Sequence, residues 1–189
     1  MKKFMKNPIF ILFIILVSCS SPKKFEISSY QRKNWKHWID EDRDCQNTRA
    51  EILSQRSTAQ VVFSKNGCTV KRGRWNDYYY PEVLSQAKLI DIDHLVPLKH
   101  AHYSGGADWS ADKKKHFAND PDNLVITNRR FNRMKGAKGI DQWLPVKIDY
   151  ACKYTKDWIK IKTKYGLQFS PEENKTIGDL KPKCHNLTF

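Results

Sequence analysis

Acidic, imidazole and amide side chains gather in two short stretches of the chain. The first holds Asp91, Asp93 and His94, and the second holds Asn123 and Asn132. A neutral imidazole accepts a proton from water near neutral pH. A carboxylate and an amide oxygen are ligands that a hard cation such as Mg²⁺ prefers. Together, these groups could activate a water molecule and offset negative charge on a phosphate, which is what hydrolysis of a phosphodiester requires.

The surrounding pattern predicts how these residues are positioned. An alternating segment predicts a strand at Lys88–Ile92, and a short apolar run predicts a second strand at Leu124–Thr127. A helix is expected at Asn128–Lys135, ended by Gly136. The resulting strand, long loop, strand and helix cover about residues 88–138.

Asp93 and His94 are adjacent in the sequence. Adjacent strand residues point to opposite faces, so the two side chains need a turn in order to act on one centre. Pro97 favours a turn at that place.

This arrangement resembles the HNH motif of ββα-metal nucleases, in the Asp-His/Asn/Asn form found in RNA-guided CRISPR nucleases. The resemblance implies that His94 is the general base and that Asp93 and Asn132 are metal ligands. It implies that Asn123 ties the loop and orients His94. HNH toxins of the colicin type carry a further His where this chain has Gly136, which favours Mg²⁺ or Mn²⁺ over zinc.

The resemblance extends over about Trp38–Cys184 to exported bacterial HNH endonucleases related to the nuclease portion of the GmrSD restriction system. It is carried by Arg49 with Glu51, by Trp75 and by Trp143-Leu144-Pro145, among other positions. It implies an α+β fold with a ββα-metal core, surrounding helices and DNA as the partner. We expect no nucleotide cofactor.

The chain is strongly basic. It has 34 Lys and Arg against 20 Asp and Glu, a formal net charge of +14 and a pI near 9.6. Such a surplus favours a polyanionic partner, either nucleic acid or an anionic membrane surface. A soluble basic protein without such a partner is the alternative.

Charged residues near the two stretches are candidates for supporting roles. Arg129 and Lys135 are expected to share the helix face of Asn132 and to contact phosphate, with Arg133 nearby. A solvated helix face is the alternative interpretation. Asp91 is expected to orient a neighbouring basic side chain or to cap a strand, with direct metal binding as the alternative.

The first nineteen residues have the pattern of a bacterial export signal. Three lysines precede the apolar run Ile9–Val17, which is shorter than the roughly 20 residues of a membrane span. Leu16–Cys19 resembles a lipobox, so we expect a lipid on Cys19 and an anchor on the periplasmic or extracellular side. An ordinary cleaved signal and a secreted protein are the alternative. Residues 20–34 would then be a tether, and residues 35–189 one domain.

Four cysteines remain in this exported domain. Their even number implies two disulfides, and we favour the local pairs Cys45–Cys68 and Cys152–Cys184 over the other two pairings. A structural zinc site is the weaker alternative, because the chain has no Cys-x-x-Cys pair.

The rest of the pattern predicts a mixture of helices and strands. The expected elements are a helix at 49–56 capped by Thr48, strands at Val61–Ser64 and Cys68–Lys71, an aromatic turn at Arg74–Pro81, a helix from Ser110 to Phe117, a helical stripe from Ala151 to Tyr165, and a last helix that begins at Ser170.

These observations favour a metal-dependent endonuclease that cuts DNA with little sequence preference, because contacts to phosphate carry no sequence information. Two alternatives stay open. One is a nucleic-acid-binding lipoprotein that captures DNA without cutting it. The other is an RNase that uses the same site, since nothing in the residues selects for or against a 2′-hydroxyl.

Overall fold

The computed structural model of the protein describes residues 28–184. The predicted signal segment, Cys19 and most of the predicted tether lie outside the described residues. Helices and two antiparallel sheets alternate along residues 28–184, which confirms the α+β class. None of the helices in this range combines the length and the hydrophobicity needed to cross a membrane.

The two strands predicted around the chemical groups pair directly with each other. Strand β4 (Ile90–His94) runs antiparallel to β5 (Leu124–Asn128), with His94 opposite Leu124. Helix α4 (Arg129–Lys135) follows β5 without a break. This strand–strand–helix unit lies inside the predicted range, although β4 starts and ends two residues later than the predicted strand.

Both ends of α4 follow from local chemistry. The side chain of Asn128 accepts a hydrogen bond from the backbone N–H of Arg130 at 3.0 Å, so it caps the helix. Gly136 has a φ of 57°, a conformation that costs glycine little. Its N–H donates to the carbonyl of Asn132 at 2.8 Å and closes the last turn, as predicted.

The connection between β4 and β5 is mostly helical. It contains α2 (Leu98–Ala101), the wide turn η3 (His102–Gly106), α3 (Ala111–Asn119) and the short turn η4 (Pro121–Asn123). Ser110 accepts a hydrogen bond from the N–H of Lys113 and caps α3, which confirms the predicted start. Helix α2 was not predicted from the sequence.

A second sheet precedes this unit. Its strands are β1 (Val62–Phe63), β2 (Val70–Asn76) and β3 (Val83–Gln86), in that order, and α1 (Thr48–Gln55) packs against it. The indole N–H of Trp75 donates to the carbonyl of Leu53 at 2.7 Å, so the largest ring of this core is also tied to α1.

Two helices complete the fold. The stripe predicted on α5 (Ile148–Tyr165) is buried as expected, and it packs into an aromatic core around Trp158. Ser170 and Glu173 form the predicted capping box at the start of α6 (Pro171–Leu180). The turn η5 (Lys181–Lys183) ends the described chain.

Both favoured disulfides are present. Cys45–Cys68 joins the loop before α1 to the turn between β1 and β2, and its Cα atoms are 5.1 Å apart. Cys152–Cys184 joins α5 to the chain after η5, with Cα atoms 5.5 Å apart. The pairing by sequence proximity is therefore confirmed.

Three details differ from the prediction. Asn47, and not Thr48, caps α1, because the Thr48 hydroxyl instead donates to the carbonyl of Ile39. The segment predicted as an aromatic turn begins inside β2, and β3 was not foreseen at all. The start of the predicted strand at Lys88 belongs to the short turn η2 (Ala87–Leu89).

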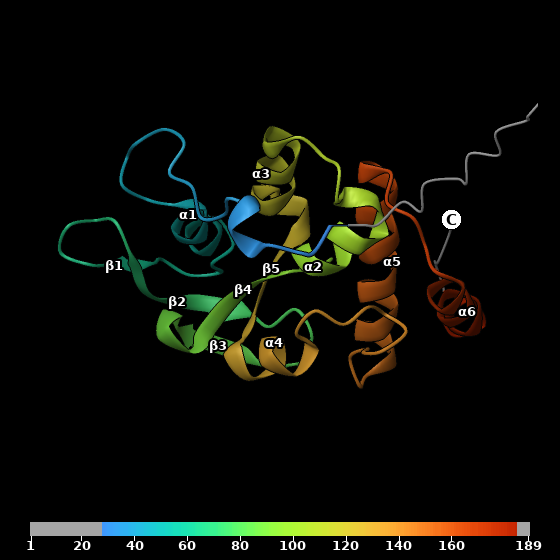
Figure 1. The fold of residues 1–189 in the computed structure, drawn as a ribbon. Coiled ribbons are helices and arrows are strands. Elements are labelled where there is room, and N and C mark those ends of the chain that lie inside the picture. The colour runs from blue at the N-terminus through green and yellow to red at the C-terminus, as the bar shows by residue number, and fades with distance from the viewer. Residues whose placement is uncertain (1–27, 185–189) are drawn as a thin grey trace, which may run out of the picture.

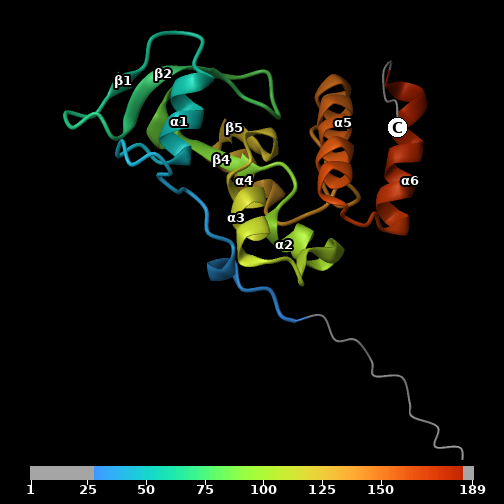
Figure 2. The ribbon, with the colours of Figure 1, turned by 90° about the horizontal axis from the view of Figure 1, so that it is seen from above.

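The elements form a row of layers in space. Figure 1 shows α1 and the β1–β3 sheet on one side, α5 and α6 on the other, and the β4–β5 pair with α4 between them. Figure 2 shows α6 beside α5, on the side that faces away from the sheets. The strand–strand–helix unit therefore occupies the middle of the molecule.

Candidate active site

A pocket of about 270 Å³ lies beside the end of β4. Asp93 and His94 from β4 and Asn132 from α4 all line it. Both residues lie within β4, where Asp93 pairs with Val125 and His94 with Leu124, so the turn expected between them is absent and the chain bends only after His94. Further lining side chains, Tyr30 and Arg32, come from the segment before α1.

His94 is buried and held in one protonation state. Its Nε2 lies 2.8 Å from the backbone carbonyl of Ala118, which can only accept a hydrogen bond, so Nε2 carries the proton. Burial lowers the pKa of His94 to about 3, and the opposing hydrogen bond to Ala118 does not restore it. The ring is therefore neutral at ordinary pH, with the lone pair on Nδ1.

Two rings fix the orientation of the His94 imidazole. Trp38 stacks on it, with ring centroids 5.8 Å apart and planes inclined by 29°. His37 approaches it edge-on at 6.2 Å. Both residues precede α1, in a segment that no local sequence pattern links to β4.

One carboxylate oxygen of Asp93 is already engaged by neighbouring side chains. Its Oδ2 accepts the hydroxyl hydrogen of Tyr79 at 2.6 Å and pairs with the ammonium of Lys135 at 2.8 Å. Burial, and then the negative charge of Asp93, raise the pKa of Tyr79 well above its ordinary value, so Tyr79 remains a donor. No residue in the range 28–184 is hydrogen-bonded to Oδ1, which leaves that oxygen for a ligand.

Asn132 is oriented by the other acidic residue of β4. The amide Nδ2 donates to Asp91 Oδ2 at 3.1 Å, while Arg129 pairs with Asp91 Oδ1 at 3.3 Å. Because the amide nitrogen is engaged by Asp91, the amide oxygen of Asn132 is the atom left for a ligand. Asp91 therefore contacts the neighbouring basic side chain Arg129, as an orienting residue would, and also the Asn132 amide.

Asn123 braces the loop and does not line the pocket. It is fully buried, and its side chain accepts from the N–H of Val96 at 2.8 Å and donates to the Val96 carbonyl at 3.3 Å. Its backbone carbonyl accepts the N–H of Leu95 at 2.7 Å. These bonds fix the turn that directly follows His94.

The basic residues of α4 divide into two groups. Lys135 is fully buried, and its ammonium also donates to the backbone carbonyl of His94 at 2.9 Å. It supports Asp93 and the end of β4 from within the core, so it is not free to contact a phosphate. Arg133 is exposed, and Arg129 is half-exposed beside Asp91.

The donor set of the pocket suits a hard cation. Asp93 Oδ1 and the Asn132 oxygen would supply one carboxylate and one carbonyl ligand, and two protein ligands are typical of Mg²⁺, which keeps several waters. The pocket has no cysteine, and its one histidine donates its Nε2 proton to the backbone. This chemistry fits Mg²⁺ or Mn²⁺ better than zinc.

Comparison with known proteins assigns a family. Residues 44–179, most of the chain, match the C-terminal domain of the GmrSD restriction endonucleases. The chain belongs to this family. Membership in the GmrSD C-terminal domain family indicates an endonuclease and confirms the resemblance to that restriction system.

A relative of this GmrSD-type domain is described as an uncharacterized secreted protein of the fungus Arthroderma benhamiae. It is 33% identical over 157 residues, which cover 82% of this chain and 76% of the relative. A secreted relative and two disulfides indicate an exported protein, but a fungal relative gives no support to a bacterial source. No solved structure matches the chain.

Several residues of the site carried no signal in the sequence. Tyr79 lies in a run of three tyrosines, and only the folded chain shows which of them reaches Asp93. In the sequence, Lys135 is one of several cations on a basic helix, and nothing there distinguishes it as the buried one. Both residues contact the Asp93 carboxylate.

A larger pocket of about 740 Å³ adjoins the first and shares Lys99 and Ala137 with it. Glu173 lines this pocket, and its Oε2 forms a buried ion pair with the ammonium of Lys162 at 2.7 Å. His100 Nε2 is 3.3 Å from Glu173 Oε1. These groups join α5 to α6.

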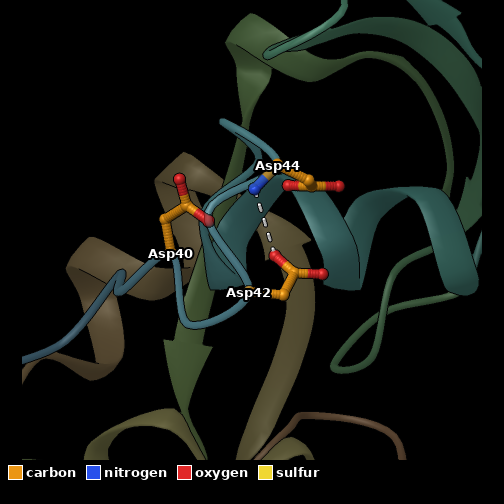
Figure 3. A group of neighbouring side chains, drawn as sticks. All are labelled: Asp40, Asp42 and Asp44. Carbon is orange, nitrogen blue, oxygen red and sulfur yellow. Dashed lines mark hydrogen bonds between the residues drawn. The ribbon is translucent and has the colours of Figure 1, made fainter.

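Three carboxylates gather on the loop before α1 (Figure 3). Ligand oxygens of Asp40, Asp42 and Asp44 all lie within 4.8 Å of one another. Their alternation, followed by Glu51, has the ligand spacing of a twelve-residue calcium loop. All three are exposed and accept hydrogen bonds from backbone N–H groups of their own loop. We therefore assign no ion to them.

Proposed function

We propose that this protein is an exported, metal-dependent endonuclease that hydrolyses phosphodiester bonds of DNA through a ββα-metal site. One observation carries the proposal: a single pocket holds an imidazole with a free lone pair together with one carboxylate and one amide oxygen. Membership in an endonuclease family supports it.

In this proposal, His94 is the general base. Its Nδ1 accepts a proton from the attacking water, and the Nε2 hydrogen bond to Ala118 keeps the lone pair on Nδ1. Asp93 and Asn132 hold the cation through one oxygen each. A bound divalent cation supplies positive charge that offsets the charge on the scissile phosphate and on the leaving oxygen.

The remaining residues position these groups. Lys135 and Tyr79 hold the Asp93 carboxylate, and Asp91 aims the Asn132 amide. Asn123 fixes the turn after His94. In this proposal, these contacts hold the reacting groups in position before the reaction begins.

The net charge of +14 favours a nucleic acid as substrate. We propose DNA, with little sequence preference, and keep an RNase with the same site and a non-cutting DNA-capturing protein as rival functions. The proposed location is outside the cell membrane. The lipid anchor at Cys19 remains a proposal, with a freely secreted protein as its alternative.

The test is direct. The purified, processed protein is incubated with plasmid, linear DNA and RNA, each with Mg²⁺ and with EDTA. Nicking and linearisation of DNA in Mg²⁺, abolished by EDTA, are expected. Cleavage of RNA alone would favour the RNase, and DNA binding without any cleavage would favour the capture protein.

A further inference from the structure

We infer that Arg32 contacts the scissile phosphate and is a catalytic residue of the proposed nuclease. The inference rests on the proposed function and deepens it. Arg32 lies in the short turn η1 (Arg32–Asn34) and lines the same pocket as Asp93, His94 and Asn132. The family match begins at residue 44, so the segment that supplies Arg32 lies outside it.

The segment that carries Arg32 is anchored on both sides of this residue. On one side, the backbone carbonyl of Ser28 accepts a hydrogen bond from His102 Nε2 at 2.6 Å. On the other, Asn119 donates to the carbonyl of Lys36 at 2.8 Å. Between them, Trp35 is buried among aromatic rings of the core. The position of Arg32 beside the pocket is therefore built into the fold.

One neighbour holds the guanidinium in place. Arg32 Nη2 lies 3.3 Å from His37 Nε2, and His37 Nδ1 lies 2.9 Å from the carbonyl of Trp35. That carbonyl can only accept, so Nδ1 carries the proton and Nε2 accepts from Arg32. A guanidinium has five N–H donors, so this single bond leaves a pair free for another acceptor.

Other cations near the site are less suited to this task. Lys135 is buried against Asp93, and Arg129 is paired with Asp91. Lys99 also lines the pocket, but no hydrogen bond fixes its ammonium within residues 28–184. Among the described lining residues, Arg32 is the cation that combines free donors with a fixed position.

The chemistry of the guanidinium fits a phosphodiester. Its planar fork binds two oxygens of a phosphate at once, whereas an ammonium binds as a point charge. Donors fixed before the reaction stabilise the charge that develops on the phosphate in the transition state. Arg32 would bind the two non-bridging oxygens while His94 takes the proton of the attacking water.

The test compares Arg32→Ala, Arg32→Lys and Arg32→Gln with wild type on plasmid DNA and on bis(4-nitrophenyl) phosphate. The small diester has no neighbouring nucleotides, so only contacts to the reacting phosphate affect its hydrolysis. Lys33→Ala is the matched control, because Lys33 is an exposed cation of the same turn that does not line the pocket.

A loss of kcat of roughly 10²–10³-fold is expected for Arg32→Ala and Arg32→Gln on both substrates. Arg32→Lys should regain only part of the rate, and Lys33→Ala should match wild type. Near wild-type hydrolysis of the small diester by Arg32→Ala would overturn the inference, and a defect on plasmid alone would assign Arg32 to general DNA binding. If wild type cuts neither substrate, the proposed function itself fails, and the inference with it.

Discussion

Substitutions of the neighbouring residues His94 and Asp93 should lower the rate of cleavage for different reasons. His94→Ala removes the proposed base, so the nicking rate should drop by roughly 10²–10⁴-fold at any metal concentration. Asp93→Ala removes a proposed ligand and leaves Lys135 buried without its partner, so cleavage should drop and recover in part at high Mg²⁺ or Mn²⁺. The measurement is the initial rate of plasmid nicking against metal concentration.

Asn132→Ala is the intermediate case. It removes a neutral ligand and leaves no buried charge unpaired, so it should resemble Asp93→Ala with a smaller defect and no loss of stability. Wild-type rates for His94→Ala at saturating metal would mean that the base lies elsewhere, and the assignment of this pocket would have to be abandoned.

The burial of His94 predicts an unusual pH profile. A base works only when unprotonated, so the rate rises as pH increases through its pKa. Because burial lowers the pKa of His94 to about 3, from an ordinary 6.5, this rise should be complete well below neutral pH. Nicking rates measured from acid to neutral pH should therefore be flat near 6.5. A rise centred there would show that the working imidazole is exposed to solvent.

Some residues of the site could be predicted from the sequence, and others could not. Asp93, His94 and Asn132 were identified because their types and order carry the chemistry, and the structure brings them to one pocket. Tyr30, Arg32 and Tyr79 were missed, because each comes from a distant segment and is selected only by tertiary packing. The metal and base roles themselves remain predictions.

At the scale of elements, the contact between α5 and α6 depends on a buried charge pair. Glu173→Gln leaves the Lys162 ammonium buried without a counter-charge, which should cost about 3–5 kcal/mol of unfolding free energy. The matched control is Asp179→Asn on the same helix, where the pair with Lys175 is exposed and should matter little. Urea denaturation measures both, and equal losses would contradict the prediction.

The same pair sets a pH dependence. Burial alone would raise the pKa of Glu173, but hydrogen bonds from His100 and Lys162 outweigh it and hold the value at about 2, below the ordinary 4.5. A depressed carboxyl pKa stabilises the fold above 4.5, and this contribution is lost as pH falls toward 2. Between these pH values, the unfolding free energy of Glu173→Gln should therefore fall less steeply than that of wild type.

Element boundaries could be predicted where local chemistry decides them. Asn128 and Gly136 fix α4, and Ser110 and Ser170 cap the helices that follow them. Strand β3 could not be predicted, because it exists only through pairing with β2 across a register shift. Thr48 stands where the sequence predicts a helix cap, but its hydroxyl donates a hydrogen bond to the carbonyl of Ile39 instead. No local sequence pattern reveals that contact.

For the whole molecule, the two disulfides should stabilise the fold without serving the site. Neither pair lines the pocket, and their sequence separations are 23 and 32 residues. Replacing either pair by serines should lower the unfolding free energy by roughly 3–4 kcal/mol in the chain-entropy model. Nicking at low temperature should stay near wild type. Loss of activity in a variant that is still folded would show that a disulfide positions the site.

The protonation state of His94 depends on a backbone atom, the carbonyl of Ala118. Every amino acid supplies that same carbonyl, so no substitution of side chains at position 118 can delete the acceptor. Neither an alanine scan nor a survey of natural variation would therefore detect that the proposed base depends on this carbonyl. Part of the proposed catalytic site therefore depends on the path of the main chain, and any sequence that keeps the end of α3 in place would keep it.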